Sequence, residues 1–562
     1  MMEMERILLV EPNYKNKYPP IGLMKISTYY KKNGDFVEFH KGLMPQTEAK
    51  TYDKVFITTL FTFDFSMCVQ TIRYYIAIVG IENVFVGGIA ATIMPENFEK
   101  EIPGVKILTN QLISSNLLGY KDNVNIDILE LDYDILWDVA YEYPMADSYF
   151  IYTSRGCPRK CVFCAVKTLE PIFYDCNNIA VQIKNVDSNF GIKKNLLVMD
   201  NNILYSKNLY NAIKIINSCG FGTNNNVIKK NNKMKYYIES LINRIRINKK
   251  YNNLLNRIKK EFINLNFKRI SKKDSSVLHN AIELINNNSD SEVIDFIIDN
   301  SDFIIDFYDR YNYHKIKRYV DFNQGLDARL FTNDNAKKLS ELALNPCRIA
   351  FDSLKTKNDY LKAMKLCVDN GITKFSNYLL YNFDEKPEDL WIRLYLNIQF
   401  RKENNNIQLF SFPMKYASIE NIDRKYIGEY WNNKYLRAVN VILNVTSGVV
   451  PKEEDFFFRA FGHNEKEFLL ILTMPDDFIR HRDFFEEKGL TQLWKKCYLK
   501  LSTNEKKDLI NILEKMVDDP EIINRQYSKN ISDILFYYSI TKKRYDQSKL
   551  FYTNFVNSFR QK

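Results

Sequence analysis

The sequence predicts an α/β protein with roughly three domains, and three observations support this fold class. Short buried-strand patterns alternate with helical patterns near the N-terminus, and the same rhythm returns between residues 149 and 414. Apolar residues make up 46% of the 562 residues, which is enough for real hydrophobic cores. After residue 415 the strand patterns end and helical patterns remain. We therefore expect a doubly wound parallel sheet, then a partial (β/α)6 barrel with a helical insertion, and last a C-terminal helical domain.

The N-terminal domain, residues 1–130, is predicted from five apolar runs separated by helical segments. Because strands that alternate with helices form parallel sheets, we expect a doubly wound sheet here. The predicted helices span residues 21–32 and 66–79. The predicted strands span residues 6–12, 36–39, 55–60, 84–88 and 105–108.

The second domain, residues 131–415, is predicted from six further strand patterns, each followed by a connecting segment. Six such units make an open partial barrel, in which the functional site lies at the carboxyl ends of the strands. Residues 221–316 interrupt the rhythm and are predicted to be a helical insertion. The predicted barrel strands span residues 149–153, 196–202, 319–329, 348–353, 374–383 and 407–414.

The C-terminal domain, residues 416–562, is expected to be a helical cap over the open end of the barrel. Helical patterns cover residues 426–443 and 505–517, and aromatic residues are dense between residues 430 and 461. Such a cap would exclude water from a reactive site.

Composition also bounds the cellular setting. The chain has nine cysteines, and six of them are scattered without a pairing pattern, as in proteins of a reducing compartment. We find no signal segment and no apolar run near 18 residues. A cytoplasmic protein without a membrane partner is therefore expected.

The net charge of +11 is concentrated in one part of the insertion. Residues 221–270 contain 13 Lys and Arg against 2 Asp and Glu, whereas the segment around Asp295–Asp306 is acidic. One interpretation is that the basic and acidic limbs of the insertion pair with each other. The alternative is that residues 221–270 bind the phosphates of a nucleic acid.

Three of the cysteines form one compact motif after the apolar run Tyr149–Thr153. Their spacing is CxxxCxxC, given by Cys157, Cys161 and Cys164. Thiolates favour iron–sulfur clusters or zinc. Three thiolates on a 4Fe–4S cube leave one iron open for another ligand. The alternatives are a zinc knuckle and buried free thiols. A structural zinc site needs a fourth ligand, but Cys176 has no CxxC partner and no His lies between residues 40 and 279.

This motif resembles the signature of the radical S-adenosylmethionine (SAM) enzymes, in which an aromatic residue precedes the last cysteine. The resemblance implies a 4Fe–4S cluster on the three cysteines, with Phe163 near the adenine of SAM. It also implies SAM as cofactor, cleaved by one electron to a 5′-deoxyadenosyl radical, and a reducing partner such as a flavodoxin or ferredoxin.

Other positions match the family less well. The strand end Asp200-Asn201-Asn202 stands where the family holds the SAM amino group, although the usual Gly-Gly-Glu is absent, and a helix cap is the alternative. The polar residues Asn323, Gln324 and Asp327 are expected to line the barrel mouth, or Asp327 forms a salt bridge with Arg329. Ser376 is a further candidate contact to SAM, on a strand whose family glycines are replaced.

The N-terminal domain resembles the cobalamin-binding domain of many radical SAM enzymes, mainly at Tyr18–Met24 and Asn33–Asp35. The axial-histidine motif DxHxxG is absent, so cobalamin stays an open alternative. Gly87-Gly88 either lets a nucleotide tail approach or makes a tight turn. Uncharacterised bacterial and phage radical SAM proteins share two motifs with this chain, over a resemblance that spans residues 5–480 apart from the insertion: Pro20–Ser27 and Asn323–Asp327.

The sequence thus predicts a radical SAM enzyme whose substrate, reaction and catalytic residues are unassigned. Methyl transfer is expected if cobalamin binds. Two alternatives stay open at this point: an enzyme that modifies RNA or DNA docked on residues 221–270, and a non-catalytic iron–sulfur scaffold.

Overall fold

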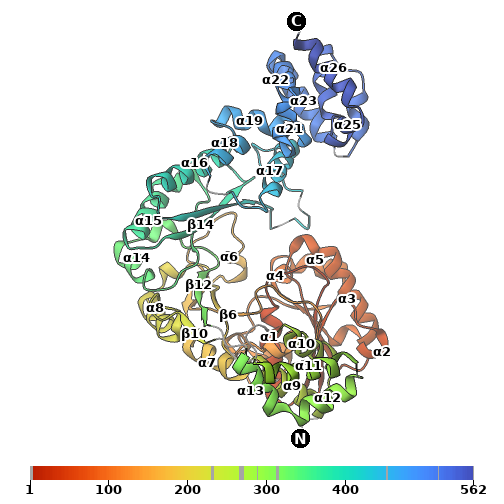
Figure 1. Ribbon diagram of the computed structural model, residues 1–562, viewed down its shortest axis with the longest axis vertical. Helices are drawn as coiled ribbons and strands as arrows, with labels where there is room; N and C mark the ends of the chain where they lie inside the picture. The colour runs from red at the N-terminus through yellow and green to blue at the C-terminus, as the bar shows by residue number, and fades with distance from the viewer. Residues whose placement is uncertain are drawn as a thin grey trace. The chain divides into compact units, whose positions relative to one another are not determined.

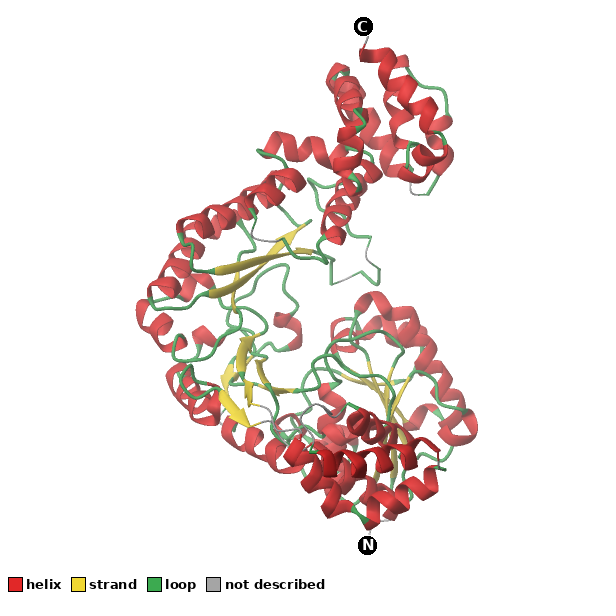
Figure 2. Ribbon diagram, viewed as in Figure 1, coloured by secondary structure: helices red, strands yellow, loops and turns green. Residues whose placement is uncertain are grey.

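The fold is taken from a computed structural model, shown in Figures 1 and 2. It describes residues 4–176, 178–229, 233–264, 271–287, 289–311, 315–419, 421–423, 425–450, 453–516 and 518–560. The chain divides into two compact units. The first unit comprises Met1–Cys347 and Ser418–Arg424, and the second comprises Arg348–Ala417 and Lys425–Lys562. The division into three domains that the sequence suggested stays a prediction.

A five-stranded parallel sheet forms the N-terminal part of the first unit, in the order β2-β1-β3-β4-β5. The predicted doubly wound sheet is therefore confirmed, with the strand order of flavodoxin-like folds. Its central strands β1, β3 and β4 are mostly buried and are packed with helices, as an all-parallel sheet requires. The strands are β1 (Arg6–Glu11), β2 (Phe36–Lys41), β3 (Lys54–Thr58), β4 (Val84–Gly87) and β5 (Lys106–Leu108), and the helices are α1 (Ile21–Lys32), α2 (Gln46–Ala49), α3 (Phe65–Val79), α4 (Ile89–Ile93) and α5 (Pro95–Glu101).

A linking segment, residues 109–147, follows this sheet and consists mostly of turns. Its 3-10 helix η5 (Tyr133–Trp137) packs on α1 and β2. Asp132 caps η5, because its side chain accepts a hydrogen bond from the backbone N–H of Asp134. The segment leads directly into the next strand.

Three parallel strands follow in the first unit, in the order β12-β9-β6. They are β6 (Ser148–Ile151), β9 (Asn195–Val198) and β12 (Tyr319–Phe322), and Asn195 pairs with both Ser148 and Tyr319. Because the strands are parallel and in register, their carboxyl ends lie at one edge and their amino ends at the other. The accompanying helices are α6 (Val166–Leu169), α7 (Ile179–Phe190), α8 (Leu209–Ile216) and α14 (Asn333–Leu339).

The predicted helical insertion is confirmed for the described residues. An antiparallel ribbon of β10 (Val227–Lys229) and β11 (Lys315–Lys317) joins its two ends. The helices between them share one apolar core, and Figure 1 shows them grouped together. They are α9 (Lys233–Arg246), α10 (Asn252–Ile263), α11 (Lys272–Asn287), α12 (Asp290–Asp299) and α13 (Ser301–Tyr311).

The second unit begins with three more strands, in the order β13-β14-β15. All six strands predicted for the barrel are thus present, but they pair as two three-stranded sheets among the described residues. One continuous (β/α)6 barrel sheet therefore stays a prediction. The elements are β13 (Cys347–Ala350), α15 (Lys357–Asp369), β14 (Lys374–Tyr381), α16 (Pro387–Glu403) and β15 (Gln408–Lys415).

The rest of the second unit is helical, as predicted. The expected helix over residues 426–443 begins later, at Asn433, because the Asn432 side chain caps it by accepting a hydrogen bond from the N–H of Tyr435. The expected helix over 505–517 is α23 (Thr503–Lys515), and residue 517 lies outside the described residues. The covering of the strand ends by these helices stays a prediction. The helices are α17 (Asn433–Val445), α18 (Glu454–Phe461), α19 (Glu465–Thr473), α20 (Asp476–Arg480), α21 (Arg482–Glu487), α22 (Leu490–Lys500), α23, α24 (Lys529–Tyr538), α25 (Lys542–Gln547) and α26 (Lys549–Arg560).

A helix that could cross a lipid bilayer is not found among the described residues.

Candidate functional site

The cysteine loop, residues 156–164, follows β6 at the carboxyl edge of the three-stranded sheet of the first unit. Two short antiparallel strands, β7 (Ser154–Arg155) and β8 (Tyr174–Asp175), form its base. Gly156 enters the loop with a φ of +73°, and a Cβ atom there would lie 2.2 Å from the carbonyl oxygen of Ile172. Glycine is therefore the residue that lets the chain turn into the loop at this point.

The three thiols of the loop are neither buried nor fully exposed. A turn brings the backbone N–H of Cys164 to the carbonyl of Cys161, at 3.1 Å. The side-chain amide of Asn202 donates a hydrogen bond to the sulfur of Cys157, at 3.6 Å. The Oδ1 atom of Asn202 is buried and has no hydrogen-bond partner. An amide donor to a sulfur beside an unsatisfied acceptor is an arrangement that a further ligand at the cysteines would complete.

The other two residues of the strand-end triplet point to protein partners. Both oxygens of Asp200 are held by Thr153 and Ser154, whose hydroxyls and backbone donate to them. Burial raises the pKa of Asp200 to about 6, although those hydrogen bonds oppose the shift. Asn201 donates to Glu170 at 2.7 Å. Asn202 precedes a 3-10 helix but makes no side-chain cap bond to it, so the helix-cap interpretation does not explain this residue.

The polar residues after β12 reach two other parts of the first unit. Asn323 accepts a hydrogen bond from the hydroxyl of Tyr18, at 2.9 Å. Gln324 is exposed. Asp327 forms the predicted ion pair with Arg329 at 2.7 Å, and also pairs with Arg159 inside the cysteine loop, at 2.5 Å. Asp327 therefore fixes the cysteine loop as well as its own turn.

Arg329 adds positive charge next to the thiol of Cys161. Its pKa is raised, first by the hydrogen bond to Asp327 and further by the thiol of Cys161. Phe163 is half-buried in the turn before Cys164. Cationic and amide donors next to sulfur stabilise thiolates, which are the form that binds iron.

Ser376 lies in the second unit, on β14, and is buried. Its hydroxyl oxygen accepts a hydrogen bond from Arg348, at 3.1 Å. Its predicted contact with SAM stays a prediction.

A chain of charged side chains supports the cysteine loop from α1, and sequence reasoning missed it. Lys25 pairs with Asp127 at 2.9 Å, Asp127 with Arg155 at 3.3 Å, and Arg155 with Glu170 at 3.1 Å. Glu170 also accepts a hydrogen bond from the backbone N–H of Gly156, at 2.7 Å. Although burial opposes the change, Lys25 and Arg155 lower the pKa of Asp127. The one sequence signal was Lys25 within the motif Pro20–Ser27.

The carboxyl edge of the N-terminal sheet carries a buried ion pair of its own. Glu11, at the end of β1, pairs with Lys41 at 2.5 Å and accepts a hydrogen bond from Tyr143. A Cβ atom on Gly88 would lie 2.5 Å from the carbonyl oxygen of Thr59, so the tight-turn interpretation explains this glycine. Residues 11–22 contain no His, so the chain offers no axial ligand for cobalamin at the position of the family motif.

Several cations of the basic stretch form ion pairs, in part as predicted. Lys259 pairs with Asp290 of the acidic limb at 2.7 Å. The most buried cation, Arg244, pairs instead with Asp134 and Asp138 of the linking segment, at 2.9 and 2.6 Å. Residues 230–232 and 265–270 of this stretch lie outside the described residues. Charges used to hold the insertion on the linking segment are not free for phosphates.

Across the described residues, no three His, Cys, Asp or Glu side chains are grouped as the ligands of one metal ion. The thiolates of a 4Fe–4S cube bind different irons, so they stand farther apart than the ligands of a single ion.

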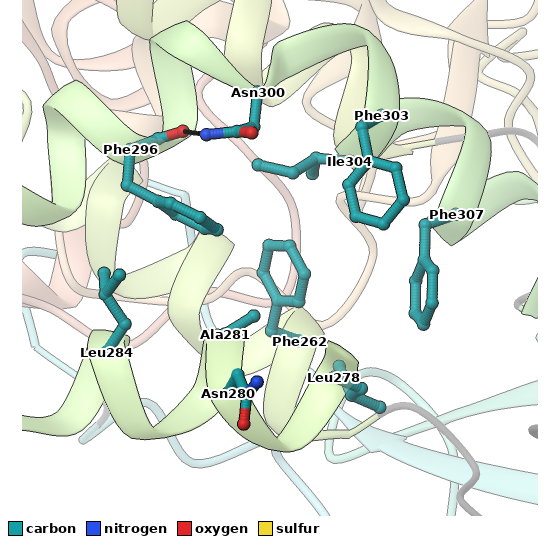
Figure 3. Close-up of a pocket in the computed structure, with 10 residues that line it drawn as sticks. All are labelled: Phe262, Leu278, Asn280, Ala281, Leu284, Phe296, Asn300, Phe303, Ile304 and Phe307. Atoms are coloured by element: carbon teal, nitrogen blue, oxygen red, sulfur yellow. Dashed lines mark hydrogen bonds between the residues drawn. The ribbon is translucent and has the colours of Figure 1, made fainter. Parts of the chain in front are cut away.

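Two cavities, each of about 250 Å³, lie in the first unit away from the cysteines. One is apolar and belongs to the insertion, where Figure 3 shows Phe262, Phe303 and Phe307 around it. Its Asn300 donates to the carbonyl of Phe296 at 2.9 Å. The other cavity is polar and aromatic, and lies between the linking segment and the insertion.

Comparison with known proteins gives weak structural likenesses. No family model and no curated protein matches the chain. A solved structure of the radical SAM methyltransferase TsrM from Kitasatospora setae, with tryptophan substrate and a SAM analogue bound, is 13% identical over 70% of this chain and 71% of that one, with a TM-score of 0.37. A structure of the cobalamin-dependent radical SAM enzyme OxsB, with aqua-cobalamin bound, is 12% identical over 93% of this chain and 72% of that one, with a TM-score of 0.40.

Proposed function

We propose that the chain is a radical SAM enzyme that holds a 4Fe–4S cluster on Cys157, Cys161 and Cys164. The observation that carries the proposal is the surroundings of the cysteine loop. The sulfur of Cys157 accepts a hydrogen bond from the side-chain amide of Asn202, and the buried Oδ1 atom of Asn202 has no hydrogen-bond partner. Three thiols in one loop at the carboxyl edge of parallel strands, with an amide donor at Cys157 and the Arg329 guanidinium at Cys161, fit a cluster with one open iron.

When bound, such a cluster supplies the electron that cleaves SAM to methionine and a 5′-deoxyadenosyl radical. The chain's own residues bind SAM and orient it and the cysteine loop. Asn202 donates to the sulfur of Cys157, and its free Oδ1 is the acceptor we assign to the SAM amino group. Asp327 and Arg159 hold the loop in place through their ion pair. Phe163 is proposed to pack near the adenine.

Two residues that the sequence predicted as SAM contacts, Asn201 and Asp200, are proposed instead to position other parts of the site. Asn201 donates to Glu170, which also accepts the N–H of Gly156. Asp200 holds the end of β6 through Thr153 and Ser154. Asn323, Gln324 and Ser376 remain candidate contacts to SAM or substrate.

The reaction that follows radical formation is unassigned, and the substrate class is open. Methyl transfer is proposed only if cobalamin binds, and the missing axial histidine weighs against an axially ligated form. A flavodoxin or ferredoxin is proposed as electron donor. Docking of a nucleic acid on residues 221–270 stays an alternative, although Arg244 and Lys259 of that stretch are used in ion pairs within the protein.

The test of cluster binding is anaerobic reconstitution of the full chain with iron and sulfide. About four irons per chain and a charge-transfer absorption are expected, since a 4Fe–4S cube has four irons. Cys157→Ser, Cys161→Ser and Cys164→Ser should each lose most of the iron. Cys176→Ser, a half-buried thiol outside the motif, is the matched control and should keep it. Equal iron in all four variants would contradict the ligand assignment.

The test of catalysis is mass spectrometry for 5′-deoxyadenosine after addition of SAM and dithionite. The wild type should form it, and Asn202→Ala should form it more slowly while retaining its iron. A fully loaded cluster that never cleaves SAM would favour the non-catalytic scaffold. Added cobalamin tests methyl transfer, through formation of S-adenosylhomocysteine.

A further inference from the structure

The polar cavity of the first unit lies at the amino ends of the strands whose carboxyl ends lead to the cysteine loop. Asp147, on its wall, directly precedes β6, and Lys193 stands two residues before β9. The carbonyl of Asp147 accepts the backbone N–H of Asn195, which joins the two strand starts. The cavity and the cysteine loop are therefore at opposite edges of the same sheet, so an occupant of the cavity is not part of the radical chemistry.

Aromatic rings form most of the apolar wall of this cavity. Trp137 of η5 meets Tyr237 of α9 edge to face, with ring centroids 5.1 Å apart. Tyr133 packs against Phe190 at 5.6 Å. Rings contributed by the linking segment, α7 and α9 thus face one space of about 250 Å³. That volume is below the range of drug-sized ligand pockets, so it suits a single ring with a small substituent.

Two lysines bring positive charge to the same space. Among the described residues, no carboxylate lies within ion-pair distance of Lys193 or Lys233, whereas Lys260 on the cavity wall is paired with Glu142 at 2.8 Å. The ammonium of Lys193 donates to the carbonyl of Phe190 at 3.1 Å and lies 4.4 Å from the ring centroid of Tyr133. Burial lowers the pKa of Lys193 to about 8; the charge of Asp147 opposes this decrease, and the charge of Lys233 adds to it. Three carboxylates, Glu142, Asp147 and Glu261, also line the cavity, and against the effect of burial they raise the pKa of Lys233. None of them lies within ion-pair distance of Lys193 or Lys233 among the described residues, so both ammonium groups keep donors for an anion.

We propose that this cavity binds a small planar aromatic molecule that carries an acidic group, with the ring among the aromatic side chains and the acid at Lys193 and Lys233. Aromatic side chains take a flat ring by stacked or edge-to-face contacts. An ammonium donating to a carboxylate or phosphate makes a charge-assisted hydrogen bond, which is stronger than a neutral one. The proposal does not depend on the radical SAM assignment.

The test is calorimetric titration of the full-length protein with phenyl phosphate, and with phenol and inorganic phosphate as matched probes. Phenol lacks the acid and phosphate lacks the ring. Phenyl phosphate should bind in a saturable way and about tenfold or more tighter than either. Lys193→Met and Lys233→Met, which keep an apolar stem, should each weaken it about tenfold or more. Lys495→Met, an exposed lysine of the second unit, should leave it unchanged.

Quenching of Trp137 fluorescence by phenyl phosphate places the ligand in the cavity, and Trp137→Phe should abolish that signal. If Lys193→Met lowers the melting temperature, Lys233→Met decides the result. Absence of saturable binding up to about 10 mM phenyl phosphate would overturn the proposal. Equal affinity in Lys193→Met, Lys233→Met and Lys495→Met would overturn it too. Iron content and 5′-deoxyadenosine formation are measured separately, so failure here is distinguishable from failure of the radical SAM proposal.

Discussion

The buried ion cluster between α9 and the linking segment allows a sharp prediction about stability. Arg244 and Lys249 are each 1% exposed, and Asp138, which pairs with both, is 2% exposed. The distances are 2.6 Å from Asp138 to Arg244 and 3.0 Å to Lys249. Asp138→Asn keeps the shape of the side chain but removes its charge, and so leaves two buried cations with one carboxylate fewer. Breaking a buried ion pair in this way lowers the free energy of unfolding by about 3–5 kcal/mol.

An exposed pair between the linking segment and the neighbouring helix α10 provides the control. Glu142 and Lys260 lie 2.8 Å apart, but their side chains are 58% and 60% exposed. Water screens such a pair, so Glu142→Gln should cost less than about 1 kcal/mol. Each variant replaces a carboxylate with the matching amide. The difference between Asp138→Asn and Glu142→Gln therefore measures how much burial strengthens the contribution of an ion pair to stability.

Amide hydrogen exchange in peptides from α9 and α10 is the measurement, because it reports the opening of this region without requiring the whole chain to unfold in one step. The cost given above corresponds to exchange faster by on the order of a hundred- to several-thousand-fold in Asp138→Asn. Glu142→Gln should change it less than about tenfold. If Asp138→Asn exchanges no faster than Glu142→Gln, the buried pair does not hold the insertion in place and the reasoning is refuted.

Two further predictions concern the candidate site. Gly156→Ala should prevent cluster assembly and lower the melting temperature, because its Cβ would lie 2.2 Å from the Ile172 carbonyl; normal iron content in that variant would contradict the account of the loop. For Asp200, the pKa is raised from 3.8 to about 6, so the protonated side chain stabilises the fold below about pH 4 and this contribution is lost as pH rises toward 6. At about 1.4 kcal/mol per pKa unit, the loss is about 3 kcal/mol. The melting temperature of the wild type minus that of Asp200→Asn should therefore fall between pH 4 and 6, and a rise would contradict the assignment.

The helices and strands could be predicted because each depends on the pattern of apolar residues within one short segment. Apolar runs such as Ile7–Val10 and Leu196–Val198 are buried strands, and their order along the chain is enough to predict parallel pairing. The cysteine spacing likewise lies within one loop. The pairing of the six barrel strands could not be predicted in the same way. It depends on contacts between strands far apart in the sequence, such as β9 and β12, which the insertion separates by more than a hundred residues.

Partners of charged residues could not be predicted, because they lie far apart in the sequence. The basic stretch and Asp134 and Asp138 were both visible as charges, yet the acidic limb beyond residue 290 looked like the natural partner. In the structure, Arg244 is buried against the linking segment, where Tyr237 of the same helix packs edge to face on Trp137. Burial then requires a carboxylate at that place, since an unpaired buried cation is costly. Hydrophobic packing thus decides which carboxylates the cations meet.

The strand end Asp200-Asn201-Asn202 shows the same limit at the candidate site. Sequence reasoning treated the three residues as equivalent acceptors for SAM, because all three follow a buried strand. The chain turns there, so the side chains diverge: Asp200 reaches Thr153, Asn201 reaches Glu170 and Asn202 reaches Cys157. The first two have protein partners that account for their burial, whereas the buried Oδ1 of Asn202 has none. An unsatisfied buried acceptor costs roughly 1–3 kcal/mol, so Asn202 is the member of the triplet whose position a ligand at the cysteines would explain.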